Sequence, residues 1–353
     1  MPGTPAGATE ATVGLFSVGY YVHHQGSGHT HRALSISQAL PADVTVTGLS
    51  TAPKPTGWPG EWVQLADDAG ALPTQGLTAG GRLHYVPLGH DGLRTRMAQI
   101  ADWIDQHQPD LMIVDVSVEV ALLARLHGVR VVSVAMPGQR DDPAHRLGYD
   151  VSDHLLAPWP TAVGPLWPAT AEDRAKTTFV GAISRFAPLS RPVQTFRRVV
   201  VLNGNGGAGP SPTAIADAAA ATPDWEWVHL DRAHGRWVED PWPLLCSAGV
   251  VVSHAGQNAI AEIAAARRPA VVIPQERPFR EQRVMADALA GRARMPVVVR
   301  PGWPAPQDWP ALLAQTEALD GTRWRAWNDG HGAERAVALL LDLLPERTAA
   351  VSA

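Results

Sequence analysis

Short apolar runs alternate with stretches of helical periodicity along the whole chain. The short runs predict buried strands, at residues 12–22, 44–49, 83–88, 111–115, 129–135, 198–202, 226–230, 249–252, 270–273 and 297–299. The periodic stretches predict helices, at residues 30–40, 94–107, 118–127, 240–247, 311–318 and 334–344, with others beginning near residues 212, 257 and 282. Strands that alternate with helices imply right-handed crossovers and parallel sheets. The predicted fold class is therefore α/β.

A proline-rich segment, residues 158–192, divides this pattern into two similar halves. Each half opens with a strand, a glycine-containing turn and a helix. A chain of 353 residues is long enough for two domains of ordinary size. We predict two Rossmann-like domains facing across a cleft, formed by residues 1–182 and 183–331. Residues 50–81, rich in Pro, Gly and Trp, are expected to form a long functional loop.

Polar residues follow two strands of the first half. The turn Gly26-Ser27-Gly28-His29 leads from a strand into a helix, and Asp115 ends the strand 111–115. Ligands on parallel sheets bind at the carboxyl ends of the strands, so this turn and Asp115 are expected to share one rim. Histidine side chains can act as acid or base near neutral pH, so His29 is a candidate for either role. Taken alone, the turn fits a simple helix cap equally well.

The second half has its clearest polar turn at His254-Ala255-Gly256, between a strand and a helix. Unpaired N–H groups and the helix dipole make such a turn an anion site. Glu262 lies about two helical turns further on. A carboxylate there can accept two hydroxyl bonds from a ribose diol, but taken alone Glu262 fits an ordinary surface acid better. Glu281 and Gln282 open the next helix and are candidates for contact with sugar hydroxyls. The glycine-rich loop 203–209 offers further N–H groups to a diphosphate.

Composition narrows the possible classes of function. The formal net charge of −5 argues against general nucleic-acid binding. The single cysteine, Cys246, fits a reducing compartment and excludes an internal disulfide or a multi-cysteine metal site. The N-terminus lacks the basic start and apolar run of a signal peptide, and no stretch approaches about 18 apolar residues. We expect a cytoplasmic protein with at most peripheral membrane contact.

Several cofactor and catalytic motifs are missing from the sequence. Gly26 and Gly28 lack the third glycine of a dinucleotide fingerprint, and no Gly-Lys-Ser/Thr follows the loop 203–209. No Asp-x-Asp follows a strand, and neither a His-Glu-x-x-His motif nor a Gly-x-Ser-x-Gly elbow occurs. We therefore expect neither a metal nor another cofactor.

Several sequence blocks resemble one known family. SHAGQNAIAEIAAARRPAVVIPQERPFREQ, with WVEDPWPLLCSAGVVV before it, resembles the donor-binding half of GT-B glycosyltransferases. The similarity is to the family 28 type, which includes the peptidoglycan N-acetylglucosaminyltransferase. GSGHTHRALSISQAL is similar to the first loop and helix of that superfamily, and VVVLNGNGGAG to its second glycine loop. These blocks cover both halves in the expected order.

This resemblance implies an inverting, metal-independent transfer of a sugar from a nucleoside diphosphate, with uracil as the expected base. His29 would be the catalytic base and Asp115 the acid that orients it. Residues 254–256 and 203–207 would hold the diphosphate, and Glu262 the ribose. The implied donor site comprises Gly28, Asn203, Gly204, Asn205, Gly206, Val238, His254, Ala255, Gly256, Glu262, Glu281 and Gln282. The terminal helix, within residues 332–346, would pack back on the first domain.

The acceptor and the reaction stay open at this point. A small-molecule, glycan or lipid-linked hydroxyl acceptor is compatible with the sequence, and the acidic first half favours a soluble one. A nucleotide-sugar hydrolase of the same superfamily would use a similar Gly-x-Gly-His loop with water as acceptor. A non-catalytic sugar-nucleotide-binding subunit is the alternative that is not an enzyme.

Overall fold

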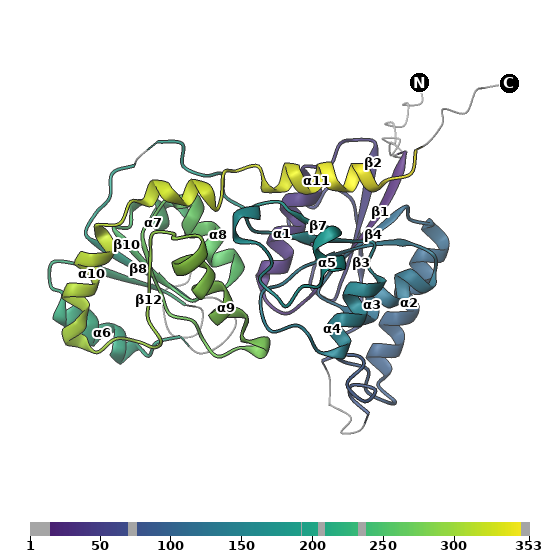
Figure 1. Ribbon diagram of the computed structural model, residues 1–353, viewed down its shortest axis with the longest axis horizontal. Coiled ribbons are helices and arrows are strands. Elements are labelled where there is room, and N and C mark those ends of the chain that lie inside the picture. The colour runs from purple at the N-terminus through teal and green to yellow at the C-terminus, as the bar shows by residue number, and fades with distance from the viewer. Residues whose placement is uncertain (1–14, 70–75, 192, 204–208, 232–237, 347–353) are drawn as a thin grey trace, which may run out of the picture.

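The computed structural model describes residues 15–69, 76–191, 193–203, 209–231 and 238–346. Two α/β units lie side by side along the long axis (Figure 1), each built on its own sheet. All the strand pairs among these residues are parallel. The predicted α/β class with two Rossmann-like units is confirmed.

The first unit has seven strands in the order β3-β2-β1-β4-β5-β6-β7. Apolar runs such as LMIVD in β4 are buried along their whole length because helices cover both faces of a parallel sheet. The strands are β1 Phe16–Val22, β2 Val44–Ser50, β3 Glu61–Gln64, β4 Leu111–Asp115, β5 Arg130–Val134, β6 His154–Ala157 and β7 Thr177–Phe179. The helices are α1 Ser27–Gln38, α2 Asp91–His107, α3 Val118–Leu126, α4 Pro143–Val151 and α5 Ala171–Ala175.

The second unit has five strands in the order β12-β11-β10-β8-β9. The strands are β8 Arg198–Leu202, β9 Glu226–Leu230, β10 Val250–Ser253, β11 Ala270–Val272 and β12 Val297–Val299. The helices are α6 Pro212–Ala221, α7 Trp242–Ser247, α8 Gln257–Ala266, α9 Glu281–Asp287 and α10 Trp309–Glu317. The predicted strands at 198–202, 226–230 and 297–299 agree with the structure residue for residue.

The last helix, α11 Gly332–Leu343, lies against the first unit (Figure 1). Its apolar side chains, including Ala336 and Leu340, belong to the same buried cluster as Val18 and Ile36 of the first unit. Arg335 Nε donates to the backbone oxygen of Val180, 2.8 Å away. Helix α11 therefore packs on the first unit, as the sequence analysis expected.

Two parts of the sequence prediction were wrong. Residues 83–88 form turns and irregular backbone, and the edge strand is instead β3, inside the region expected to be a loop. The backbone N–H groups of His84 and Tyr85 donate to Glu119 Oε1, so they do not need a neighbouring strand. The segment 158–192, expected to be irregular, contains α5 and β7.

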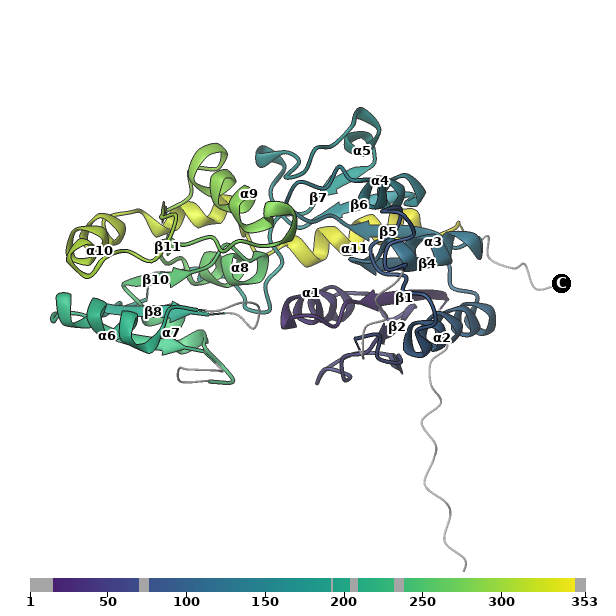
Figure 2. The same ribbon diagram turned by 90° about the horizontal axis from the view of Figure 1, so that it is seen from below.

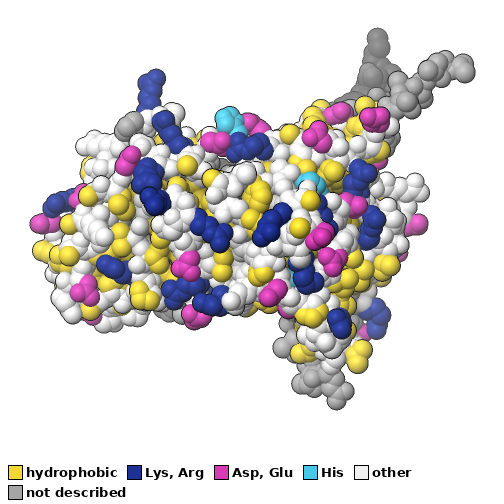
Figure 3. All heavy atoms as spheres, in the orientation of Figure 1, with side chains coloured by type: hydrophobic (Ala, Val, Ile, Leu, Met, Phe, Trp, Pro, Cys, Tyr) yellow, Lys and Arg dark blue, Asp and Glu magenta, His cyan; other side chains and the backbone are white. Residues whose placement is uncertain are grey.

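No helix in the described part of the chain is long and apolar enough to cross a membrane. On the face shown in Figure 3, basic side chains are interspersed with acidic and apolar ones.

Candidate active site

Two helices begin at one cavity between the units. Helices α1 and α8 meet with their N-termini together (Figure 2), and Gly28 lies against the Asn258 side chain, with which any Cβ at this position would collide. The cavity has a volume of about 230 Å³. Its lining includes His29, Arg32, Ser253, His254, Gln257, Arg277, Glu281 and Gln282.

Neither N-terminus has a side-chain cap among the described residues. Gly26, at the start of α1, has φ of 85°, which suits glycine. The starts of α2 and α3, away from this cavity, are instead capped by His90 and Ser117. The free N–H groups and positive dipole ends of α1 and α8 therefore converge where an anion would bind.

The predicted pair His29 and Asp115 lies at the rim of this cavity. Nδ1 of His29 is 2.9 Å from Oδ1 of Asp115. Asp115 is fully buried at the end of β4, while the His29 side chain is 16% exposed. The next residue, Val116, has φ of 65°, a strained conformation for a β-branched residue and one that is common beside functional sites.

Arg32 joins this pair and was not found by the sequence analysis. Its Nη2 lies 2.6 Å from Asp115 Oδ1, and its Nε lies 3.1 Å from Oδ2. Burial opposes ionisation of Asp115, but Arg32 and His29 together hold its pKa well below the usual value. The signal was present in the sequence, since Arg32 follows His29 by three residues and hence lies on the same helical face.

His254 is held firmly on the α8 side of the cavity. Its Nδ1 is 2.8 Å from the backbone oxygen of Ile273, and its Nε2 is 2.9 Å from Asn203 Oδ1. Asn203 in turn donates to Asp231, with a distance of 2.8 Å. Burial lowers the pKa of His254, the bond to Ile273 opposes this, and Arg277 adds to the lowering.

The other predicted donor residues near α8 are placed in different ways. Ala255 is buried, with its side chain in the core, so only its backbone faces the turn. Gly256 is the N-cap of α8. Glu281 Oε2 lies 3.4 Å from Arg140 Nη2 of the first unit, and Gln282 accepts a hydrogen bond from the backbone N–H of Gln275.

Glu262 and Val238 are not among the residues that line this cavity. Glu262 is buried and accepts a hydrogen bond from Arg185 Nε at 2.8 Å. Val238 packs against the apolar core of the second unit. The predicted residues Gly204, Asn205 and Gly206 lie outside the described residues.

A larger cavity of about 640 Å³ opens next to the first. Gln25, Arg277 and Glu281 line both. Its wall combines aromatic, charged and histidine side chains, including Tyr21, His24, Asp68, Tyr85, Arg96, Arg140, His145 and Phe279. Asp68 and its neighbour Ala69 belong to the segment 50–81, which was expected to form a long functional loop.

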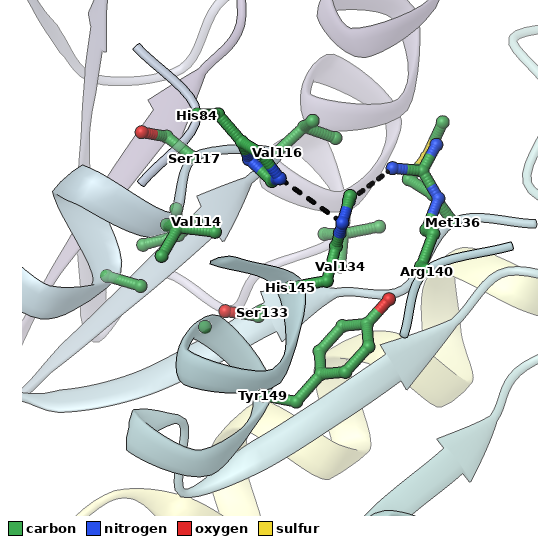
Figure 4. Close-up of a pocket in the computed structure, with 13 residues that line it drawn as sticks. His84, Val114, Val116, Ser117, Ser133, Val134, Met136, Arg140, His145 and Tyr149 are labelled. Atoms are coloured by element: carbon green, nitrogen blue, oxygen red, sulfur yellow. Dashed lines mark hydrogen bonds between the residues drawn. The ribbon is translucent and has the colours of Figure 1, made fainter. Parts of the chain in front are cut away.

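A narrow apolar recess of about 40 Å³ adjoins this larger cavity (Figure 4). Val114, Val134 and Tyr149 line its interior. His84, His145 and Arg140 form a line of contacts across it, with His84 Nε2 3.2 Å from His145 Nδ1 and Arg140 Nη1 2.7 Å from His145 Nε2. The recess therefore has apolar walls and a polar mouth.

Within the part of the chain that the structure describes, two histidine and carboxylate groups have the geometry to hold a metal ion, and the sequence analysis did not identify either. They are His84, Asp142 and His145, and His24, Asp67 and Asp68. Each group already contacts an arginine: Arg140 donates to His145 Nε2, and Arg96 pairs with Asp68. Because Arg140 donates to Nε2, the proton of neutral His145 lies on Nδ1. Nδ1 is the ring nitrogen that would remain for a metal. These contacts favour ion-pair and hydrogen-bond networks at both places.

One protein-family model matches part of the second unit. Residues 242–293 match the model of the glycosyltransferase family 28 C-terminal domain, and this range contains α7 and α8. Among curated proteins, no sequence matched this chain.

Several solved structures share the fold. The glycotransferase of kitacinnamycin superposes with a TM-score of 0.68 and 19% identity, over 93% of this chain and 99% of the other. MurG of Acinetobacter baumannii gives 0.63 and 14%, with the same coverage. Phytolacca americana UGT2, complexed with UDP-2-fluoro-glucose and pterostilbene, gives 0.60 and 14%, over 92% and 94%. The matched domain and the shared fold confirm the predicted resemblance to GT-B glycosyltransferases of the family 28 type.

Proposed function

We propose that this protein transfers a sugar from a nucleoside diphosphate to a hydroxyl acceptor, with inversion and without a metal ion. The observation that carries the proposal is the His29–Asp115 pair beside the uncapped start of α8. One feature supplies a base, and the other supplies a site for the leaving diphosphate. Both line or adjoin the same 230 Å³ cavity.

The base assignment follows from the hydrogen bonds of His29. Asp115 is ionised and can only accept, so Nδ1 of His29 carries the proton between them. Nε2 of the neutral ring then has a free lone pair. A base placed in this way typically contributes about 10²–10⁴-fold to the rate.

The chemical step is a single displacement. Nε2 of His29 takes the proton of the acceptor hydroxyl while the acceptor oxygen forms a bond to the anomeric carbon. The bond from that carbon to the phosphate oxygen breaks, and its electron pair leaves with the nucleoside diphosphate. The N–H groups at the starts of α1 and α8 stabilise the charge that develops on this leaving group. Asp115 stabilises the imidazolium that forms.

The donor and acceptor are proposed to be a uridine diphosphate sugar and a small hydroxyl-bearing molecule. The UGT2 structure, which shares the fold, was solved with UDP-2-fluoro-glucose and pterostilbene. In this chain the 640 Å³ cavity offers space for an acceptor of that size, with Phe279 as an aromatic wall and Arg140 and His145 as polar contacts.

A thermal-shift screen with UDP, TDP, GDP, CDP and ADP tests the donor site, since a ligand of the native state raises its stability. We expect UDP to give the largest shift.

His29→Ala should keep the UDP shift and lose transfer, whereas His127→Ala, at an exposed site remote from the cavity, should keep both. Normal turnover in His29→Ala would refute the base assignment. Fast stoichiometric donor cleavage without acceptor would favour a hydrolase, and nucleotide binding with no turnover of any donor or acceptor would favour a binding subunit.

A further inference from the structure

Arg32 links three elements through one buried side chain. It lies on α1, is only 4% exposed, and contacts Asp115 at the end of β4. Its Nη1 also lies 3.2 Å from Oε1 of Gln257, the first residue of α8 in the second unit. The guanidinium therefore connects the proposed base of one unit to the proposed diphosphate site of the other.

The shape of the guanidinium makes this double contact possible. Nε and Nη2 form a two-pronged contact with the Asp115 carboxylate, and Nη1 remains free to donate toward α8. A lysine ammonium at this position would keep the positive charge but is a point donor without the planar fork. The two contacts thus depend on an arginine.

The same contact orients His29. Asp115 Oδ1 receives both Arg32 Nη2, at 2.6 Å, and His29 Nδ1, at 2.9 Å. Arg32 has no lone pair, so it cannot accept the Nδ1 proton although the two nitrogens are 3.1 Å apart. By fixing the carboxylate, Arg32 fixes the oxygen on which the imidazole ring is aligned.

Gln257 contacts Arg32 and also lines the 230 Å³ cavity. Its Oε1 must be the atom that faces Arg32, because an arginine only donates. Its Nε2 is then left buried, and it has no hydrogen-bond partner within the described residues. A buried donor without a partner is unfavourable, and a phosphate or sugar oxygen in the cavity would satisfy it.

We infer that Arg32 is a positioning residue that aligns the His29–Asp115 pair and, through Gln257, couples this alignment to occupancy of the donor site. The inference rests on the proposed role of His29 as base. Donor binding at Gln257 Nε2 restrains the amide, the amide restrains Arg32, and Arg32 restrains Asp115 and His29. Because coupling between two sites is reciprocal, it is measurable from either end.

The kinetic test uses Arg32→Lys and Gln257→Ala with UDP-glucose, or whichever UDP-sugar turns over. We expect Arg32→Lys to lower kcat by about 10- to 100-fold through misalignment of the base, with the UDP Kd changed by less than about threefold. The acidic limb of the kcat profile should also move in this variant. Gln257→Ala leaves the Arg32–Asp115 pair intact and should lower kcat by about tenfold.

A second test measures His29 directly by imidazole ¹⁵N NMR, with its signal assigned from its absence in His29→Ala. In the wild type, UDP should change the titration of this ring. In Gln257→Ala the UDP effect should vanish while UDP still binds. Since this variant keeps the buried ion pair, it carries the test even if Arg32→Lys does not fold.

The outcomes separate this inference from the proposed function. Wild-type kcat and pH profile in Arg32→Lys, or an unchanged UDP effect on His29 in Gln257→Ala, would overturn the coupling while an inactive His29→Ala leaves the base assignment standing. Turnover in His29→Ala would instead refute the proposed function itself.

Discussion

Arg185 Nε donates a hydrogen bond to Glu262 Oε1 at 2.8 Å, so the carboxylate predicted to bind ribose already has a partner. Burial raises the pKa of Glu262, although Arg185 opposes this rise. The guanidinium also lies over the Phe186 ring, which stacks on Trp242 at 4.7 Å. A ribose diol that reaches Glu262 therefore competes for the carboxylate with a cation that is held by two kinds of contact.

Arg185→Ala should consequently lower the stability of the protein but strengthen its response to UDP. Loss of the cation leaves a buried carboxylate without its partner, and we expect the variant to be less stable by about 1–3 kcal/mol. UDP should raise its melting temperature more than that of the wild type, because ribose hydroxyls would satisfy Glu262 without competition. Differential scanning calorimetry with and without UDP measures both effects. Arg191→Ala, an exposed position on the same linker, is the control; a smaller UDP shift in Arg185→Ala than in this control would contradict a ribose role for Glu262.

Acid should destabilise the protein through its buried histidines. Burial, with Arg185 adding to the effect, lowers the pKa of His31 to about 4, against an unfolded value of about 6.5. Between these values the unfolded chain binds more protons than the folded one, so stability falls as pH falls from about 7 to 4. Melting temperatures of His31→Gln measured across this range should depend less steeply on pH. His331→Gln, at a largely exposed site, should follow the wild type, and identical slopes for all three proteins would exclude His31 as a cause.

The sequence predicted the sheets better than the contacts of the site. Long apolar runs and the turns after them placed β1, β4 and β10 correctly, and the shared rim of a parallel sheet brought His29 and Asp115 together as expected. Short strands such as β3 and β7 carry too few apolar residues for periodicity to identify them. These short strands form because they pair with the neighbouring strands of the sheet.

Residue spacing could not predict contacts between side chains that are far apart in the sequence. Arg185 and Glu262 are 77 residues apart, and Arg32 and Gln257 are 225 apart. No periodicity relates such positions, because their contact arises only when the linker and the two units pack. The proposed ribose role of Glu262 came from its place on the helix and from the family resemblance, and neither gave information about the arginine that contacts it.

Gly138 allows a close contact between the two units. Its φ is 130°, and a Cβ there would lie 2.6 Å from the backbone oxygen of Phe279. The next residue, Gln139, donates its N–H to that same oxygen at 2.6 Å. Gly138→Ala should therefore force the loop 277–281 away from the first unit, with a loss of stability of about 1–3 kcal/mol. Chemical denaturation measures this loss. Gly302→Ala, with open space around its Cβ and no positive φ, should be nearly neutral. Equal stabilities of the two variants would show that this contact does not constrain the loop.

Phe279 should govern the acceptor more than the donor. Its ring lines the 640 Å³ cavity, lies 4.6 Å from the His145 ring and has the Arg140 guanidinium 5.0 Å from its centre. It is not among the residues that line the smaller cavity at the start of α8. We expect Phe279→Ala to raise the acceptor KM by about 10-fold, through loss of aromatic contact worth about 0.5–1.5 kcal/mol beyond area burial, while the UDP Kd changes little. Phe279→Leu, which retains apolar bulk, should have an intermediate effect on acceptor KM. A larger change in UDP affinity than in acceptor KM would instead place Phe279 in the donor site.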